Sequence, residues 1–307
     1  MNFLDFNKQF PTELAVIQHF IKIRYKGKLV CPNCGKAEGV YHRHTSPKMI
    51  HCNNCENEFS IFTNTIFYKS DTDLRKWYFA INAMLVGKKG ISALQLKREI
   101  GVTYKTAWRM LKLIRSAMGN TDMSKAFEAI VEIDETYVGG KPRKDNYNDD
   151  DNKPPKPPLK RGRGTSKTPI VGIKERNSKR VYATVALPNA EGQQLSGKQL
   201  FKILDTVCKD DTIIFTDDFT GYNILDKKHD NNFFRLKVNH SVGQFATRNG
   251  IHTNGIESFW ALLKRGIHGI YHHISTKYLQ NYVNEFCFRM NNRINAFNTL
   301  IAHCVFA

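Results

Sequence analysis

The sequence predicts an α/β protein whose larger part is a mixed five-stranded sheet with helices, preceded by a small metal-binding ribbon and a pair of helices. Three observations lead to this prediction. Two CxxC pairs stand near the N-terminus, a helix-turn-helix pattern follows them, and the rest of the chain alternates short apolar strands with amphipathic helices. At 307 residues the chain is long enough for more than one domain.

The charge balance indicates a polyanionic partner. The chain has 46 Lys and Arg residues against 28 Asp and Glu residues, a formal net charge of +18. Nucleic acid is the simplest such partner, and a membrane surface is the alternative. No basic amphipathic helix stands out, no apolar run is long enough to cross a bilayer, and the first twenty residues lack the plan of a signal peptide. We therefore expect a cytoplasmic protein with no membrane partner.

Residues 1–27 are predicted to form a helical segment, and residues 28–66 a zinc ribbon. The stretches "VCPNCG" and "HCNNCE" each bring two thiolates to one turn, and together they supply the four ligands of tetrahedral zinc. These ligands are Cys31, Cys34, Cys52 and Cys55. A closed four-sulfur site has no open position, so the zinc is expected to be structural. The odd total of seven cysteines argues against a disulfide framework.

Residues 71–120 are predicted to be helical and to bind DNA. A first helix, capped by Asp71 or Thr72, ends near Gly87, and Ser92 to Met118 has the pattern of a helix-turn-helix. The second helix of that pair carries the side chains expected to reach DNA: Tyr104, Lys105, Arg109, Lys112 and Arg115. The alternative is an ordinary packed helix pair with solvated charges.

Residues 126–307 are predicted to form the sheet domain. The first strand, in "AIVEID", ends at Asp134 and is followed by Glu135. Residues 139–168 interrupt the domain with a mobile, basic insertion. Three basic residues of its tract "KRGRG" are expected to contact phosphates: Lys160, Arg161 and Arg163.

The remaining elements follow in the order strand, strand, helix, strand, helix, strand, helix. "PIVGIKER" and "RVYATVAL" form a hairpin, "TIIFTD" is a buried strand that ends at Asp217, and "GIESFWALLKRG" is a helix that carries Glu257. Five strands in this order describe the ribonuclease H-like fold. There the first and fourth strands are neighbours and the last helix crosses them, so Asp134, Asp217 and Glu257 are expected to meet.

Three carboxylates at one place can hold two Mg²⁺ or Mn²⁺ ions and so form a phosphate-cutting centre in a basic protein. Lys264 lies two helical turns after Glu257 and is expected to hold a DNA phosphate, with Arg265 beside it as a further DNA contact. Each acid also has a plain structural interpretation, and Glu135 or Asp218 could replace Asp134 or Asp217.

The chain resembles the zinc-ribbon DDE transposases of bacterial insertion sequences, whose catalytic part is called the ISXO-two-like transposase domain. The stretches that carry the resemblance cover most of the chain: "CPNCG", "HCNNC", "FSIFTNTIFYKS", "EIDETYVGGK", "TDDFTGY", "HTNGIESFWALLKRGIHGIYHHIS" and "YLQNYVNEFCFRMNNR". The resemblance implies Asp134, Asp217 and Glu257 as the catalytic triad, with Lys264 as the basic residue after the last acid.

The resemblance further implies DNA cutting at terminal inverted repeats, strand transfer into target DNA, a homodimer or larger assembly on DNA, and a place at the bacterial nucleoid. Two other functions remain open. A regulator that binds DNA without cutting would share the ribbon and the helices, and another nuclease of the same fold would share the acids.

Overall fold

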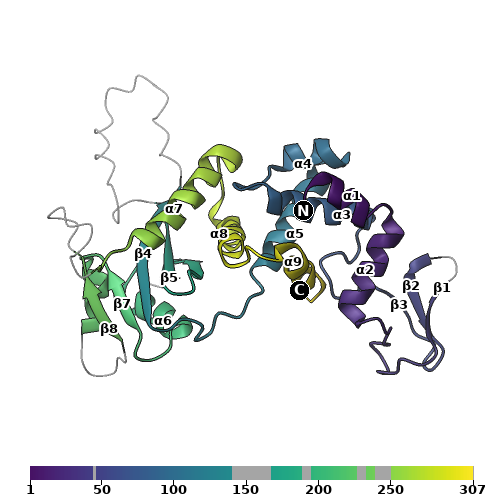
Figure 1. The fold of residues 1–307 in the computed structure, drawn as a ribbon, viewed down its shortest axis with the longest axis horizontal. Helices are drawn as coiled ribbons and strands as arrows, with labels where there is room; N and C mark the ends of the chain where they lie inside the picture. The colour runs from purple at the N-terminus through teal and green to yellow at the C-terminus, as the bar shows by residue number, and fades with distance from the viewer. Residues whose placement is uncertain (44–45, 140–166, 189–194, 227–232, 239–249, 307) are drawn as a thin grey trace, which may run out of the picture. The chain divides into compact units, whose positions relative to one another are not determined.

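The computed structural model describes residues 1–43, 46–139, 167–188, 195–226, 233–238 and 250–306. It divides the chain into two compact units (Figure 1). Unit 1 comprises Met1–Thr121 and Asn284–Ala307, and unit 2 comprises Asp122–Val283. The predicted insertion 139–168 lies almost wholly outside the described residues, and Lys160, Arg161 and Arg163 lie there with it.

Unit 1 combines helices with a small antiparallel sheet in the order β1-β2-β3. Its elements are α1 Phe3–Gln9, α2 Glu13–Tyr25, β1 Val40–Arg43, β2 Ser46–Cys52, β3 Glu58–Ser60, α3 Leu74–Val86, α4 Ala93–Ile100, α5 Tyr104–Met118 and α9 Ala296–Val305. One hydrophobic core runs through all of these parts, from Phe20 of α2 through Ile50 of β2 to Trp77 of α3. The predicted segments 1–27, 28–66 and 71–120 therefore share a core.

The C-terminal boundary of the sheet domain differs from the predicted 126–307. Residues Asn284–Ala307 belong to unit 1. The reason is the apolar face of α9, whose buried side chains join the core of unit 1, where α9 contacts α2, α3 and α5. These side chains are Leu300, Ile301, Cys304 and Val305. The helix α8, Thr276–Asn291, begins in unit 2 and ends in unit 1.

The caps of α4 and α5 explain why two helices form where one long helix was possible. Ser92 accepts a hydrogen bond from the Gln95 N–H at 3.1 Å and starts α4. Gly101 ends α4 with a left-handed backbone, and Thr103 starts α5. The predicted helix pair is present. The cap of α3 differs from the prediction, because Asp73, and not Asp71 or Thr72, accepts the hydrogen bond at its start.

Unit 2 is built on a five-stranded mixed sheet in the order β6-β5-β4-β7-β8. Its elements are β4 Ile130–Val138, β5 Thr168–Glu175, β6 Val181–Val185, α6 Gly197–Val207, β7 Ile213–Thr216, the 3-10 helix η2 Thr220–Asp226, β8 Phe234–Lys237 and α7 Asn254–Gly266. β4 pairs antiparallel with β5 and parallel with β7. The first and fourth strands are therefore neighbours, as predicted. β4 is longer than predicted, so Asp134 lies in its middle and not at its end.

The two faces of this sheet have different chemistry, because successive side chains of a strand alternate between faces. Val131 and Ile133 of β4 pack in one core with Leu200 and Leu204 of α6. The opposite face carries Glu132 and Asp134, and α7 runs across β4 and β5 (Figure 1). Trp260 of α7 lies so close to Gly172 of β5 that a Cβ there would stand 2.5 Å from its ring. Among the described residues, we find no helix with the length and apolar character needed to cross a membrane.

Candidate active site and metal centre

The four cysteines of the ribbon lie together, with all their sulfur atoms within 4.8 Å of one another. Cys31 Sγ is 3.6 Å from Cys55 Sγ, and Cys34 Sγ is 3.7 Å from Cys52 Sγ. Four sulfurs at 2.3 Å from one zinc ion would be about 3.8 Å apart in a tetrahedron, so the spacing fits zinc. Among the described residues this is the only such group of three or more cysteine, histidine or acidic side chains.

The two turns of the zinc site share a backbone geometry that their sequences make possible. Gly35 follows Cys34 with φ 70°, and Glu56 follows Cys55 with φ 53°. Each of these left-handed residues turns the chain back after a CxxC pair. Burial raises the pKa of Cys52, but backbone N–H groups of Asn54 and Cys55, with the neighbouring thiols, lower it to about 6. A backbone N–H of Lys36 lowers the pKa of Cys34, but burial and hydrogen bonds with the other thiols raise it to about 11. The thiolate that zinc requires is therefore favoured at Cys52 and not at every sulfur.

The parallel pairing of β4 with β7 brings Asp134 close to Asp217, which directly follows β7. The parallel register pairs Glu132 with Phe215, and continuing it by two residues sets Asp217 next to Asp134. Neighbouring strands are about 4.8 Å apart. Burial, with the negative charges of Glu135 and Asp217, raises the pKa of Asp134 to about 7. The sheet therefore concentrates negative charge that a cation would neutralise.

The alternatives to these two acids occupy different surroundings. Glu135 points to the other face, where its carboxylate accepts a hydrogen bond from the Tyr222 hydroxyl at 3.0 Å. Asp218 is exposed, whereas Asp217 is half-buried and accepts a hydrogen bond from the Phe219 N–H at 3.0 Å. The geometry favours Asp134 and Asp217 over their sequence neighbours.

Arg235 of β8 fixes the backbone at Asp217. Its guanidinium donates to the Thr216 hydroxyl at 2.9 Å and to the Asp217 carbonyl at 3.2 Å, and it pairs with Asp226 at 2.8 Å. The side chain is only 2% exposed. A buried arginine of this kind orients the loop after β7, so that Asp217 keeps its place at the end of the strand.

Trp260 connects α7 to the first acid. Its indole N–H donates a hydrogen bond to Asp134 Oδ2 at 3.0 Å, while its ring packs on Gly172. Glu257 lies three residues earlier on the same helix. Its side chain is exposed and accepts a hydrogen bond from the Thr253 hydroxyl at 2.9 Å.

The three predicted acids are not gathered as closely as the four cysteines. Asp134, Asp217 and Glu257 do not form a group whose oxygens all lie within 4.8 Å among the described residues. A two-ion site does not require that spacing. Two ions about 4 Å apart, each about 2.1 Å from its ligands, allow ligand atoms to be up to roughly 8 Å apart.

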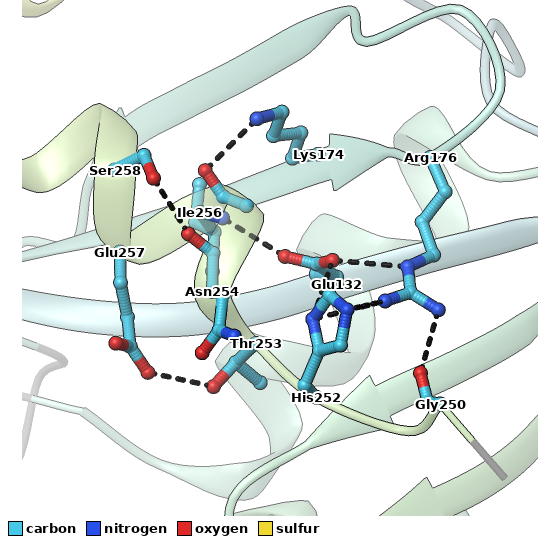
Figure 2. A network of polar contacts seen from close by, with 11 residues as sticks. Glu132, Lys174, Arg176, Gly250, His252, Thr253, Asn254, Ile256, Glu257 and Ser258 are labelled. Carbon is cyan, nitrogen blue, oxygen red and sulfur yellow. Dashed lines mark hydrogen bonds and ion pairs between the residues drawn. The ribbon is translucent and has the colours of Figure 1, made fainter. Parts of the chain in front are cut away.

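A buried acid that the sequence did not single out holds the start of α7 (Figure 2). Glu132 is 2% exposed, and its carboxylate accepts a hydrogen bond from the Ile256 N–H at 2.9 Å. The same carboxylate pairs with Arg176 at 3.0 Å and lies 3.5 Å from the His252 ring. A Cβ at position 255 would stand 2.6 Å from Glu132 Oε2, so a residue larger than Gly255 would have to displace this carboxylate. Glu132 therefore caps α7 from β4, a role normally taken by the residue before the helix.

The basic residues around Glu132 extend the same network to the chain before α7 (Figure 2). Arg176 also donates to the Gly250 carbonyl at 2.9 Å and contacts the His252 ring. Lys174 donates to the Gly255 carbonyl at 2.9 Å. The helix that carries Glu257 is thus tied to β4 and β5 by its backbone. The sequence signal that could have identified Glu132 is its alternation with Asp134, which puts both acids on one face of the strand, but its partners are distant in sequence.

Four of the five side chains predicted to bind DNA from α5 are accessible. Tyr104, Lys105 and Arg109 are exposed, and Lys112 is half-buried above the Trp108 ring at 5.7 Å. Lys105, Arg109 and Lys112 follow a spacing of four and three residues, so they share one side of α5.

Arg115 corrects the prediction, because it lies in the core of unit 1. It is 4% exposed, and its guanidinium pairs with Glu285 at 2.7 Å. It stands four residues after the buried Leu111, on the apolar side of α5, and helical periodicity could have excluded it. On α7, by contrast, Lys264 and Arg265 are both exposed.

Comparison with known families agrees with these two structural parts. The model of the ISXO2-like transposase domain matches residues 127–291, which include Asp134, Asp217 and α7. The model of the transposase zinc-ribbon domain matches residues 11–58, which include the four cysteines and α2.

Individual relatives carry similar descriptions. An uncharacterized protein in transposable element ISH50 of Halobacterium salinarum is 29% identical over 267 residues, which cover 84% of each chain. An uncharacterized transposase-like protein of Haemophilus influenzae is 33% identical over 113 residues, which cover 37% of this chain and 82% of that protein.

Solved structures of Mos1 transposase show a distant likeness. The pre-cleavage Mos1 transpososome has 12% identity and a TM-score of 0.27, covering 73% of this chain and 78% of that one. The Mos1 paired-end complex with the left transposon end has 13% identity and a TM-score of 0.29, covering 75% of each. These values are too low to support an inference about this chain.

The family match, in contrast, spans more than half of the sequence and contains the whole of the central sheet. The chain belongs to the family of ISXO2-like transposases.

Proposed function

We propose that this protein is an insertion-sequence transposase that binds terminal inverted repeats, cuts DNA to free 3′-OH ends and joins those ends to target DNA. The observation that carries the proposal is that Asp134 lies close to Asp217 beneath α7. The same helix carries Glu257 and Lys264, whose side chains are both exposed. The four cysteines are assigned to one structural zinc ion, as the ribbon geometry supports.

The donor set fits hard divalent cations. Asp134, Asp217 and Glu257 offer carboxylate oxygens, the ligands that Mg²⁺ and Mn²⁺ prefer. Burial, with the negative charges of Glu135 and Asp217, raises the pKa of Asp134 to about 7, and a bound cation would favour its charged form. Two such ions, when bound, activate the attacking oxygen and stabilise the leaving oxygen of a displacement at phosphorus. Glu257 would exchange its hydrogen bond with Thr253 for this role.

The protein groups around the acids orient them and the DNA. Trp260 holds the Asp134 carboxylate, Arg235 holds the backbone at Asp217, and Glu132 holds the start of α7. Lys264 and Arg265 bind phosphates of the strand that is cut. Lys105, Arg109 and Lys112 on one side of α5, with Tyr104 at its start, recognise the repeat as a helix-turn-helix does. Two ends must be joined, so a dimer or larger assembly forms on DNA.

The test is nicking of DNA that flanks the gene, measured with the purified protein in Mg²⁺, Mn²⁺ or EDTA. Asp134→Asn is compared with Asp218→Asn, a matched change at the exposed neighbour of Asp217. We expect metal-dependent 3′-OH formation by the wild type and by Asp218→Asn. In Asp134→Asn we expect the rate of 3′-OH formation to fall by more than the ~100-fold that is typical when a residue hydrogen-bonded to a metal ligand is changed.

Two outcomes would contradict the proposal. If Asp134→Asn still cuts DNA, then Asp134 is not part of the catalytic site. Tight, salt-sensitive DNA binding without cutting in any metal would instead favour a regulator that binds the same DNA.

A further inference from the structure

A cavity of about 340 Å³ opens where β4 and α7 end, away from the acids. Its basic lining consists of Lys167, Lys264, His268, His272 and His273. A second cavity of about 310 Å³ adjoins it and shares Lys167 and His273. None of the described residues that line the first cavity is acidic. The lining therefore suits an anion.

The backbone that presents the histidines is unusual. After Gly266, α7 continues as a π-helical turn, Ile267–Tyr271, and His272 follows with φ 57° and ψ −54°. Single π-helical turns are rare and are often found at functional sites. A non-glycine residue in such a conformation is strained, and the strain persists where the surroundings fix it. His268 lies within the turn and His272 and His273 directly follow it, and all three line the cavity.

The lining also narrows the class of ligand. The ring nitrogens of the three histidines do not come within 4.8 Å of one another as a metal-binding group, within the part of the chain that the structure describes. Tyr137 and Ile267 add apolar walls. The volume is at the low end for small-ligand pockets. A phosphate with its sugar matches both the charge and the walls.

The position of the cavity relates it to the acids. Lys264 is seven residues after Glu257 on α7, about 10 Å along the helix. Val138 is four residues after Asp134 on β4, about 13 Å along the strand. One DNA strand advances about 3.4 Å per nucleotide, so these distances correspond to about three or four nucleotides.

We propose that this cavity binds a backbone phosphate of the cut DNA strand, three or four nucleotides from the bond that is broken. The proposal rests on the proposed function, and it names the part of the substrate that the protein holds beside its acids. Lys167 and Lys264 supply the charge, and the histidines supply hydrogen-bond donors from the π-helical turn and the two residues after it.

The test pairs neutral phosphates with protein variants. Single methylphosphonates replace successive phosphates in a duplex that the wild type cuts, and binding is measured for the wild type, Lys167→Gln, His273→Ala and Lys198→Gln. Lys198 is an exposed lysine of α6, on the other side of the sheet, and serves as the matched control. Zinc content and circular dichroism show that each variant is folded.

We expect one methylphosphonate, at the third or fourth position, to weaken wild-type binding about tenfold. The same methylphosphonate should weaken DNA binding by Lys167→Gln and His273→Ala much less, because these variants have already lost the contact with that phosphate. It should weaken DNA binding by Lys198→Gln as much as binding by the wild type. Lys167→Gln should also reduce the slope of log K against log salt by about one.

The proposal would be overturned if the effect of a methylphosphonate and the effect of a protein variant on binding simply added at every position. The proposed cutting of DNA would not be affected by that result. Calorimetry with inorganic phosphate and with 2′-deoxyadenosine 5′-monophosphate provides a second arm. Tight binding of either, combined with additive effects on DNA, would assign the cavity to a free phosphate ligand. A wild type that neither binds nor cuts any duplex would overturn the proposed function and this site together.

Discussion

At the scale of single residues, Glu285 and Asp134 show how neighbours set the charge of a carboxylate. Burial and two nearby acids raise the pKa of Asp134 to about 7. Burial also raises the pKa of Glu285, but the guanidiniums of Arg115 and Arg289 outweigh it and hold the pKa below its ordinary value. Glu285 is fully buried and pairs with Arg115 at 2.7 Å and Arg289 at 2.6 Å. Glu285 has two guanidiniums as counter-charges, whereas the neighbours that shift the pKa of Asp134 most are themselves acids.

Glu285→Gln should destabilise unit 1 by about 3–5 kcal/mol at pH 7, because two buried guanidiniums lose their partner. The folded pKa of Glu285 is depressed, so its contribution is present above the unfolded value near 4.3 and is lost as pH falls through the lower folded value. Urea unfolding of the variant and the wild type at pH 7 and pH 3 measures this. The difference should shrink at pH 3.

The matched control is Glu58→Gln, which breaks the exposed pair between Arg43 and Glu58 in the same unit. An exposed pair contributes less than about 1 kcal/mol. Equal losses in the two variants would show that burial of the Glu285 cluster has no special effect.

At the scale of elements, the structure attaches α7 to β4 at two points. Glu132 holds its first turn, and Trp260 holds Asp134 one turn further on. Glu257 lies between these two attachments. The position of the third acid relative to the first therefore depends on an acid that is itself buried and paired with Arg176.

Glu132→Gln should loosen the first turn of α7. The carboxylate accepts a hydrogen bond from Ile256 and pairs with Arg176, and charge-assisted bonds contribute about 1.5–3 kcal/mol. We expect amide exchange at Ile256 and Glu257 to rise about tenfold or more, with a lower kcat and an unchanged KM for DNA. Glu135→Gln, on the other face of β4, is the control. If amide exchange at Ile256 and Glu257 is unchanged in Glu132→Gln, then Glu132 does not hold α7 in position.

The ribbon gives a second prediction at this scale. Cys52→Ser should remove the zinc and unfold part of unit 1, because Cys31, Ile50 and Cys52 belong to the same core as its helices. Cys287→Ser, outside the cluster, should keep one zinc ion per chain. Atomic absorption and helical circular dichroism measure both effects. If Cys52→Ser and Cys287→Ser contain the same amount of zinc, then the four cysteines are not the metal site.

Local patterns predicted some elements well and others not at all. The CxxC pairs, the helix pair after Ser92 and the strand order act over short distances or follow from connectivity, and the structure contains them. The predicted cap of α3 at Asp71 or Thr72 is wrong, because Asp73 caps this helix. Glu132 and Arg176 were missed because their partners are 124 and 44 residues away. Residues 140–166, with three predicted phosphate contacts, lie outside the described residues, so that prediction stays open.

At the scale of the whole molecule, the two ends of the chain build one unit and the middle builds the other. The predicted boundary placed residues 284–307 with the sheet because they follow it in sequence. Hydrophobic burial decides otherwise, since α9 completes the core around α2, α3 and α5. The zinc ribbon and the proposed DNA-reading helix α5 therefore depend on the last residues of the chain.

One core variant in each unit should show that the two units lose stability independently. Ile301→Ala in α9 and Leu200→Ala in α6 each remove a fully buried side chain, at a cost of about 2–5 kcal/mol. Hydrogen exchange measured by mass spectrometry should show lost protection in α2, α3 and α5 for Ile301→Ala, with β4 and β5 unchanged. Leu200→Ala should give the reverse pattern, because its core is formed within unit 2. Loss of protection in β4 and β5 from Ile301→Ala would mean that the units unfold together and that the boundary at residues 283 and 284 has no energetic meaning.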